Sequence, residues 1–339
     1  MTWIEQQEFK PVVPKAILGT PRFLDAERDF GVHYGYMSDG QFVAAHVTTD
    51  DGIELAFMVH LMLVNPPKLP DAYPVLLDIV SLTDLTNNAF MFEERAHQND
   101  FSFSTEGLDL KCPTGSLRGD TEKLSLRAVL PQGRGTIAAD LTAQMPALYN
   151  CVQGTFPFLS GDVEAFQYGI PSLRVEGTLI LDGKSRAISG EAWLDRQWGD
   201  GSEDFVKRTF KWKWMNLNLD NGYKMSVWDV VVNGRDENAW ATIVSPKGAH
   251  TVVDIVPFSA GEGDQWTSPA TRQVYPTSFA VEMPAVDAKF FVKVAGPLEQ
   301  EIVSQVGEHK YEAACKFTGH FMGRPVSGFN YLELVGSFR

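Results

Sequence analysis

The sequence has few cysteines and no long apolar run. Its three cysteines are Cys112, Cys151 and Cys315, an odd number at wide spacing with no CxxC pair. This pattern argues against a disulfide framework and a cysteine-based zinc site, and it is typical of a reducing compartment. No stretch reaches the roughly 18 apolar residues of a membrane-spanning helix, and the first residues lack a signal-peptide core. We therefore expect a soluble, cytoplasmic protein without stable membrane insertion.

Positive charge is also scarce, and the common motifs for metals and nucleotides are missing. Lys and Arg number 29 against 43 Asp and Glu, which gives a net charge of −14. Such a chain repels polyanions, so nucleic acid is excluded as a partner. The seven histidines show neither HxH nor HExxH spacing, and GxSxG, the P-loop and a GxGxxG turn are absent. The sequence therefore predicts neither a metal site nor a cofactor.

Long helical periodicity is scarce as well, and strand patterns take its place. Roughly sixteen short alternating runs are separated by Gly, Asn, Asp and Pro, and the first covers 53–63. Typical hairpin turns occur at LDGK (181–184), LDNGY (219–223) and VNGR (232–235). This pattern indicates an all-β protein of sandwich or barrel type. One helix is predicted at 296–306.

An internal repeat divides the chain. ISGEAWLD at 188–195 recurs as VSGFNYLE at 326–333, and another glycine-containing strand precedes each copy. We interpret this as a duplicated β domain, with an N-terminal domain at 1–200, a C-terminal domain at 201–339 and the polar segment DGSED at 200–204 as the link. An antiparallel barrel of about eight strands can enclose one small apolar ligand.

The stretch SGEAWLDRQWG at 189–199 concentrates functional side chains. Strand alternation places Trp193 and Asp195 on one face, and Arg196 and Trp198 on the other. Asp195 has two interpretations. It is a desolvated acid that gives a proton at neutral pH, or it pairs with Arg196 or with backbone amides and fixes the domain junction. Glu333 occupies the equivalent place in the second copy, which favours the structural role.

The next predicted hairpin carries a second acid. Asp229 follows an otherwise apolar run, and a buried carboxyl group must be paired, hydrogen-bonded or neutral. As a neutral acid among aromatic rings it could protonate an alkene, and the rings would stabilise the cation. Alternatively, it caps the turn that follows the strand. The neighbouring candidates for substrate binding are Trp212, Trp214, Asn216, Tyr223 and Trp228.

Three segments together resemble a known family. They are 168–199, which contains GEAWLDRQWG, then WKWMNLNLDNGYKMSVWD at 212–229, and GRPVSGFNYLELVG at 323–336. This combination resembles the AttH-like, carotenoid 1,2-hydratase-like family over roughly residues 30–336. The resemblance implies two lipocalin-like (calycin) antiparallel β-barrel domains in tandem. It also implies activities that include isoprenoid hydration, as in carotenoid hydratases and kievitone hydratase, and Diels–Alder cyclisation of polyenes in fungal members.

The chain departs from the carotenoid hydratases at two positions. Those enzymes are expected to carry the acid in a Tyr-x-Asp, which reads Val227-Trp228-Asp229 here, and a His directly after the motif Asp, where this chain has Arg196. In the Tyr-x-Asp motif, the Asp is therefore present as Asp229, and the Tyr is replaced by Val227. A proton relay through position 196 is in doubt.

Three functions remain open from the sequence. The first is acid-catalysed hydration or cyclisation of an isoprenoid or polyene double bond, with Asp229 as proton donor and Asp195 or Asn216 orienting water. The second is a pericyclase that folds a polyene, with Arg196 or Lys213 near the pocket mouth. The third is a carrier of a lipophilic molecule. In each case the partner is a hydrophobic small molecule, and the protein is a monomer or homodimer.

Overall fold

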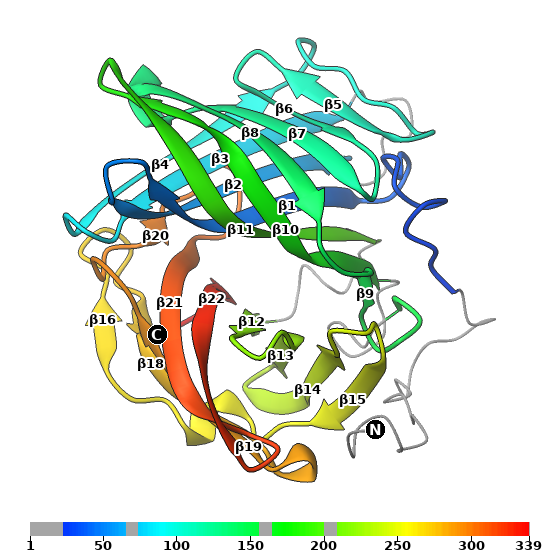
Figure 1. Cartoon of the computed structure of the whole chain (residues 1–339), viewed down its shortest axis with the longest axis vertical. Helices are drawn as coiled ribbons and strands as arrows, with labels where there is room; N and C mark the ends of the chain where they lie inside the picture. Colours follow the sequence, from blue (N-terminus) through cyan, green and yellow to red (C-terminus); the bar gives the residue numbers. More distant parts are fainter. Residues whose placement is uncertain (1–22, 66–73, 156–164, 200–208, 339) are drawn as a thin grey trace. The chain divides into compact units, whose positions relative to one another are not determined.

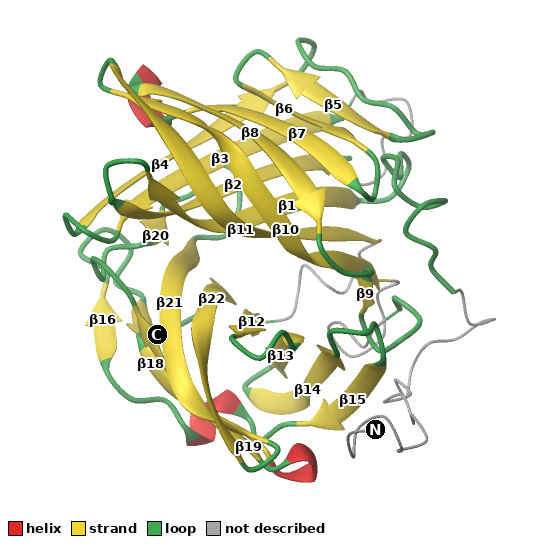
Figure 2. Ribbon diagram, in the orientation of Figure 1, coloured by secondary structure: helices red, strands yellow, loops and turns green. Residues whose placement is uncertain are grey.

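The computed structural model describes residues 23–65, 74–155, 165–199 and 209–338. The described residues form β-strands and three short 3-10 helices, η1 (Pro131–Gly133), η4 (Phe258–Ala260) and η5 (Pro284–Val286) (Figure 2). The all-β class predicted from the sequence is confirmed. None of the described residues belongs to a helix with the length and apolar character needed to cross a bilayer.

The chain divides into two compact units, each with its own antiparallel sheet (Figure 1). Among the described residues, the N-terminal unit holds 23–147 and 165–199, and the C-terminal unit holds 148–155 and 209–338. Segment 148–155 thus belongs with the later strands although it precedes residue 165 in the chain. The predicted link at 200–204 lies outside the described residues.

The sheet of the N-terminal unit has the order β4-β3-β2-β1-β11-β10-β8-β7-β6-β5 and curves toward a barrel. Its strands are β1 (Ser38–Thr49), β2 (Glu54–Val64), β3 (Val75–Asp84), β4 (Ala89–His97), β5 (Leu108–Cys112), β6 (Gly115–Gly119), β7 (Lys123–Val129), β8 (Gly135–Ala143), β10 (Ala165–Leu181) and β11 (Lys184–Gly199). The central strands are buried on both faces, as the burial of β1 and β2 shows.

The sheet of the C-terminal unit has the order β15-β14-β13-β12-β22-β21-β19-β18, with β20 beside β21. The strands of this unit are β9 (Leu148–Tyr149), β12 (Phe210–Leu219), β13 (Lys224–Val232), β14 (Arg235–Val244), β15 (His250–Asp254), β16 (Gln265–Thr267), β17 (Val274–Pro276), β18 (Ser278–Met283), β19 (Ala288–Val294), β20 (Glu301–Ile302), β21 (Lys310–Phe321) and β22 (Arg324–Gly336). Its apolar core includes Met215, Met225, Val227, Leu332 and Leu334.

The two sheets repeat one topology, as expected for a duplicated β domain. Strands β2-β1-β11-β10-β8 of the first sheet correspond in order and direction to β13-β12-β22-β21-β19 of the second. The repeated octapeptides, 188–195 and 326–333, lie on the equivalent strands β11 and β22. Each of these strands follows its partner through a tight hairpin, and each pairs on its other side with the first strand of its sheet.

The glycine shared by the two octapeptides has a steric reason. A Cβ atom at Gly190 would lie 2.1 Å from the carbonyl oxygen of His46, and one at Gly328 would lie 2.0 Å from the carbonyl oxygen of Asn218. At both places the neighbouring backbone fills the volume that a side chain would need. The repeat therefore preserves a close backbone approach.

Two of the three predicted turns have the geometry that their residues favour. Asp182 and Gly183 both have positive φ between the paired residues Leu181 and Lys184, as expected for a two-residue type I′ hairpin turn. Asn233 and Gly234 do the same between Val232 and Arg235. The LDNGY segment connects β12 to β13.

Two expectations about the elements are wrong. Residues 296–306 form no helix, because Glu301–Ile302 pairs with β21 as β20. No strand was predicted before residue 53, whereas β1 covers Ser38–Thr49 at the centre of its sheet. Both faces of β1 are buried and its apolar residues do not alternate with polar ones, so the period-two signal is absent.

We predict that Gly190→Ala and Gly328→Ala each lower the free energy of unfolding by about 1–3 kcal/mol, because the added methyl group forces the paired strands apart. Gly107→Ala is the matched control, since a Cβ there meets no atom within 4 Å. Urea unfolding of the three variants measures the effect. A loss in the control as large as in the other two would contradict the steric account.

Candidate functional site

Five directly paired residues form one row across the C-terminal sheet. Trp240 on β14 pairs with Trp228 on β13, which pairs with Trp214 on β12. Trp214 pairs with Glu333 on β22, and Glu333 pairs with Glu312 on β21. Directly paired side chains share a face with Cβ atoms about 5 Å apart. We call this set the carboxyl–indole row, and its strands can be followed in Figure 1.

The three indoles of the row are buried and held in place. The rings of Trp228 and Trp240 stack with centroids 5.9 Å apart and planes 7° from parallel. The indole nitrogens of Trp214 and Trp228 both donate to the Ser226 hydroxyl, at 3.0 and 3.1 Å. The nitrogen of Trp240 donates to the side-chain oxygen of Asn150 at 3.1 Å. The row therefore presents rigid ring faces beside its two carboxyl groups.

Glu312 is the unusual member of the row. Its side chain is 0% exposed, and its carboxyl group interacts with that of Glu333, the residue paired with it on β22. Burial, and next the neighbouring Glu333 carboxyl, raise the pKa of Glu312 well above its usual value of 4.5. Glu333 is less buried and accepts a hydrogen bond from the indole nitrogen of Trp212 at 2.5 Å. Burial and the Glu333 carboxyl group thus both favour the protonated form of Glu312.

The next row of the same sheet face is polar. It joins Thr242, Ser226, Asn216, Tyr331 and Ala314 by direct pairing. The Asn216 side-chain oxygen accepts from the Tyr331 backbone amide, and the Tyr331 hydroxyl donates to the backbone oxygen at residue 312 at 3.2 Å. These bonds fix β21, β22 and β12 around the two carboxyl groups.

The N-terminal sheet carries the equivalent row with different chemistry. Direct pairing joins Ile79, His60, Phe42, Asp195 and Gly169, so Asp195 corresponds to Glu333 and Gly169 to Glu312. A Cβ at Gly169 would lie only 2.7 Å from Asp195 Oδ1. This row therefore holds one acid, whereas the carboxyl–indole row holds two.

Asp195 is hydrogen-bonded by neutral donors. The Trp193 indole nitrogen donates to Oδ1 at 2.7 Å, and the Gln167 side-chain nitrogen donates to Oδ2 at 3.3 Å. The pairing of Asp195 with Arg196 that we considered is wrong, because Arg196 lies on the other face and binds Asp39. Asp195 and Trp193 are both buried.

Arg196 and Trp198 belong to a buried network on that other face. Arg196 donates to Asp39 Oδ1 at 2.8 Å and to two backbone carbonyl oxygens. Burial alone would raise the pKa of Asp39, but Arg196 and the bonds from His33 outweigh burial and lower it. The His33 ring stacks on Trp198 with centroids 3.7 Å apart. Arg196 is 0% exposed, so the expected place at a pocket mouth is wrong.

Asp229 lies in an ion pair and not among indoles. Its Oδ2 is 3.1 Å from Lys213 Nζ and accepts from the Phe258 backbone amide at 2.9 Å. Lys213 also contacts Glu262 at 2.8 Å. Asp229 follows Trp228 directly, so its side chain leaves the strand on the face of the apolar core. The expected ring of tryptophans around Asp229 is not formed.

Tyr223, a predicted substrate-binding residue, lies far from Asp229. It precedes Asp229 by six residues along a strand, a distance of about 20 Å. Its ring packs edge-on against Phe321, with centroids 5.0 Å apart, at the edge of the apolar core. Of the predicted substrate-binding residues, the C-terminal sheet gathers Trp212, Trp214, Asn216 and Trp228 on one face.

The sequence interpretation missed Glu312, Trp240 and Asn150 and treated Glu333 as a structural counterpart of Asp195. A signal for Glu312 existed, because YEAACKF at 311–317 places an acid in a mostly apolar strand run. Trp240 becomes visible only once β13 is paired with β14. Asn150 comes from a segment far from these strands in the chain and carried no signal.

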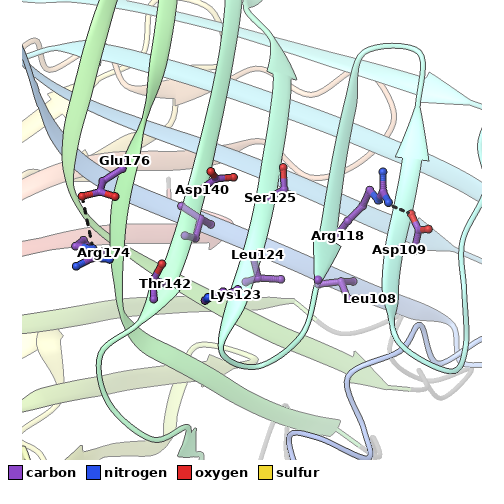
Figure 3. A pocket seen from close by; sticks show the side chains of 12 residues that line it. Leu108, Asp109, Arg118, Lys123, Leu124, Ser125, Asp140, Thr142, Arg174 and Glu176 are labelled. Atoms are coloured by element: carbon purple, nitrogen blue, oxygen red, sulfur yellow. Dashed lines mark ion pairs between the residues drawn. The ribbon is translucent and has the colours of Figure 1, made fainter.

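A separate open groove crosses the surface of the N-terminal sheet and has a volume of about 730 Å³ (Figure 3). Its charged walls include two ion pairs, Arg118 with Asp109 at 3.4 Å and Arg174 with Glu176 at 3.8 Å. It contains no residue of either row. Charged and open walls do not suit an apolar ligand, so this groove is not the candidate site.

We predict that Glu312→Gln makes stability less dependent on pH. A carboxyl group with a raised pKa holds more protons when folded than when unfolded, so the wild-type free energy of unfolding falls as pH rises above 4.5. The variant has no carboxyl group at this position, so its free energy of unfolding does not fall for this reason. The difference in free energy of unfolding between Glu312→Gln and wild type therefore grows with pH. Urea unfolding of both proteins at about pH 5 and about pH 8 measures it. An equal difference at both pH values would contradict the raised pKa.

We predict that Asp229→Asn lowers the free energy of unfolding by about 3 kcal/mol, because it weakens a buried ion pair. Glu262 still contacts Lys213 in this variant, so the loss falls at the lower end of the range for broken buried pairs. Thermal unfolding measures the change. A variant as stable as wild type would contradict the structural role of Asp229.

Comparison with known proteins supports the fold described above. The structure resembles a crystal structure of an AttH from Nitrosomonas europaea, with a TM-score of 0.79 and 22% identity over 97% of this chain and all of that one. The structure of kievitone hydratase from Nectria haematococca is also similar, with a TM-score of 0.72 and 20% sequence identity. The match covers 94% of this chain and 99% of that one. The structure of CghA with Sch210972 has a TM-score of 0.54 and 11% sequence identity, and the match covers 95% of this chain and 98% of that one.

Because the sequences are less than 25% identical, these structural similarities show the shared fold alone. No curated protein matches the chain in a sequence comparison. The model of the AttH-like family matches residues 19–337, nearly the whole chain. The chain belongs to the AttH-like family.

Proposed function

We propose that this protein is a cofactor-independent enzyme that adds water to a carbon–carbon double bond of an isoprenoid or polyene, with Glu312 as the proton donor. The observation that carries the proposal is the pairing of the buried Glu312 with the partly buried Glu333, in one row with three indoles. A general acid for an alkene must hold its proton at neutral pH. The raised pKa of Glu312 supplies that property.

The proposed chemistry needs only groups of this row and a water molecule. The double bond takes the Glu312 proton, and a carbocation forms at the more substituted carbon. The negative π-faces of Trp214 and Trp228 stabilise this cation. Water attacks the cation and gives a proton to the Glu312–Glu333 pair, which returns to its starting state. The net reaction is the addition of one water.

The similarity to kievitone hydratase supports this proposal, because that protein is named for hydration. Asp195 belongs to the N-terminal sheet, where Trp193 and Gln167 hold its two oxygens at fixed positions, and it takes no part in the step proposed for Glu312. Asp229 is no longer proposed as the acid, because it is bound to Lys213 and faces the core.

A second candidate is a pericyclase. The stacked indoles Trp228 and Trp240, with Asn216 beside them, offer a rigid apolar surface with polar groups at its edge. Such a surface can hold a polyene in a reactive conformation without proton transfer. In that case an aromatic substitution such as Trp228→Ala abolishes turnover, whereas Glu312→Gln has a mild effect.

The test is incubation with a panel of prenylated and polyene compounds, followed by mass spectrometry. We expect a product heavier by one water, formed at least about 100-fold more slowly by Glu312→Gln, the lower end of the range for general acid catalysis. Asp229→Asn is the matched control and keeps its activity at temperatures where it is folded. Retained binding, followed by tryptophan fluorescence, separates lost chemistry from lost affinity.

Other outcomes would contradict the proposal in distinct ways. A product of unchanged mass would indicate a cyclase or pericyclase. Tight binding of a panel compound without any product would indicate a carrier. A hydrated product formed equally fast by wild type and Glu312→Gln would leave hydration in place and remove Glu312 as its acid.

A further inference from the structure

Three side chains with metal-ligating atoms converge in the N-terminal unit, and none of them is a member of either row. Asp78 on β3, His97 at the end of β4 and Cys112 at the end of β5 each bring one ligand atom to within 4.8 Å of the other two. The residues are far apart in sequence, so the spacing of the histidines could not reveal them. Oxygen, nitrogen and sulfur donors of this kind are the ligands of zinc.

The Thr114 hydroxyl marks the point at which the three groups converge. It donates to Asp78 Oδ2 at 2.5 Å, and it lies 3.1 Å from His97 Nε2 and 3.4 Å from Cys112 Sγ. Asp78 is 0% exposed, and its other oxygen, Oδ1, has no hydrogen-bond partner among the described residues. A buried oxygen without a donor needs a ligand.

Oδ1 of Asp78 and the Cys112 sulfur both lie beside Gly115. A Cβ placed on Gly115 would lie 3.9 Å from both Asp78 Oδ1 and Cys112 Sγ. Glycine at this position therefore leaves the space between the carboxylate and the thiol without a side chain. The free oxygen and the sulfur border the same small volume.

The outer contacts of the cluster also fit a metal site. His97 directs Nε2 toward the cluster, and its Nδ1 lies 3.1 Å from the Asp100 carboxylate. Zinc-binding histidines commonly bond a carboxylate through the second ring nitrogen in this way. Arg95 lies 3.3 Å from Asp78 Oδ2 and opposes a cation, but Glu93 balances its charge at 2.6 Å.

We propose that Asp78, His97 and Cys112 bind one divalent zinc-like cation, with water or the Thr114 hydroxyl as the fourth ligand. The site joins opposite ends of the sheet, because β4 and β5 are the two terminal strands of its strand order. A cation held by β3, β4 and β5 would link these ends and stabilise the unit. The inference is independent of the proposed hydration.

The first experiment uses the wild-type protein, ZnCl₂ and a thiol reagent. Cys112 is partly exposed, whereas Cys151 and Cys315 are buried, so Cys112 is the first thiol of the native chain to react. We expect stoichiometric Zn²⁺ to slow this reaction at least about tenfold and EDTA to restore it. An unchanged rate at saturating Zn²⁺ would overturn the proposal.

The second experiment compares variants by calorimetric titration with Zn²⁺. We expect one site per chain and a loss of affinity of at least about tenfold in Cys112→Ala and in His97→Gln, as loss of even an outer partner causes. Cys315→Ala, in the C-terminal unit, is the matched control and binds as wild type does. Equal affinity in Cys112→Ala and Cys315→Ala would overturn the proposal.

Cobalt distinguishes this site from weak binding by surface acids and does not require the variants to fold. Co²⁺ added to wild-type protein should give sulfur-to-cobalt charge-transfer absorption, which arises only when a thiolate is a ligand. A spectrum with oxygen ligands alone would mean adventitious binding and would overturn the proposal.

Discussion

The contact between the Glu312 and Glu333 carboxyl groups is the interaction on which the functional account depends. Two acids at directly paired positions cannot both ionise without strong repulsion, and Glu312 is fully buried. Both effects favour the protonated form of Glu312 and raise its pKa well above the usual value. The register of β12, β13 and β14 then places three indoles in line with that proton.

Duplication explains how such a pair could arise. Both sheets carry an acid on the strand with the repeated octapeptide, Asp195 in one and Glu333 in the other, and both acids accept an indole N–H. The sheets differ at the next strand, where Gly169 leaves room for Asp195 and Glu312 adds a second carboxyl group. The two rows therefore differ at both positions, Asp195 against Glu333 and Gly169 against Glu312.

Much of the fold could be predicted from the sequence. The all-β class, the duplication and the hairpin turns at 181–184 and 232–235 rest on local signals such as alternation and Asn-Gly or Asp-Gly pairs. β1 could not be recognised because burial on both faces removes the alternation. The predicted helix at 296–306 failed because β20 pairs with β21 there, a tertiary contact that no local pattern reports.

The site was harder to predict because it depends on register. The sequence placed Trp212, Trp214 and Asn216 on one face correctly, but it could not show which acid shares that face. Asp229 looked suitable as the proton donor because its sequence neighbours are apolar. In the structure it forms an ion pair with Lys213 and faces the apolar core. The cluster of Asp78, His97 and Cys112, which we propose as a metal site, was equally hidden, since its members come from three strands.

Infrared spectroscopy of the protonated carboxyl group tests the central claim most directly. At neutral pH the account predicts a protonated-carboxyl band in wild-type protein that is absent in Glu312→Gln and still present in Asp229→Asn. Loss of the band in Asp229→Asn, or its persistence in Glu312→Gln, would contradict the assignment of the proton to Glu312.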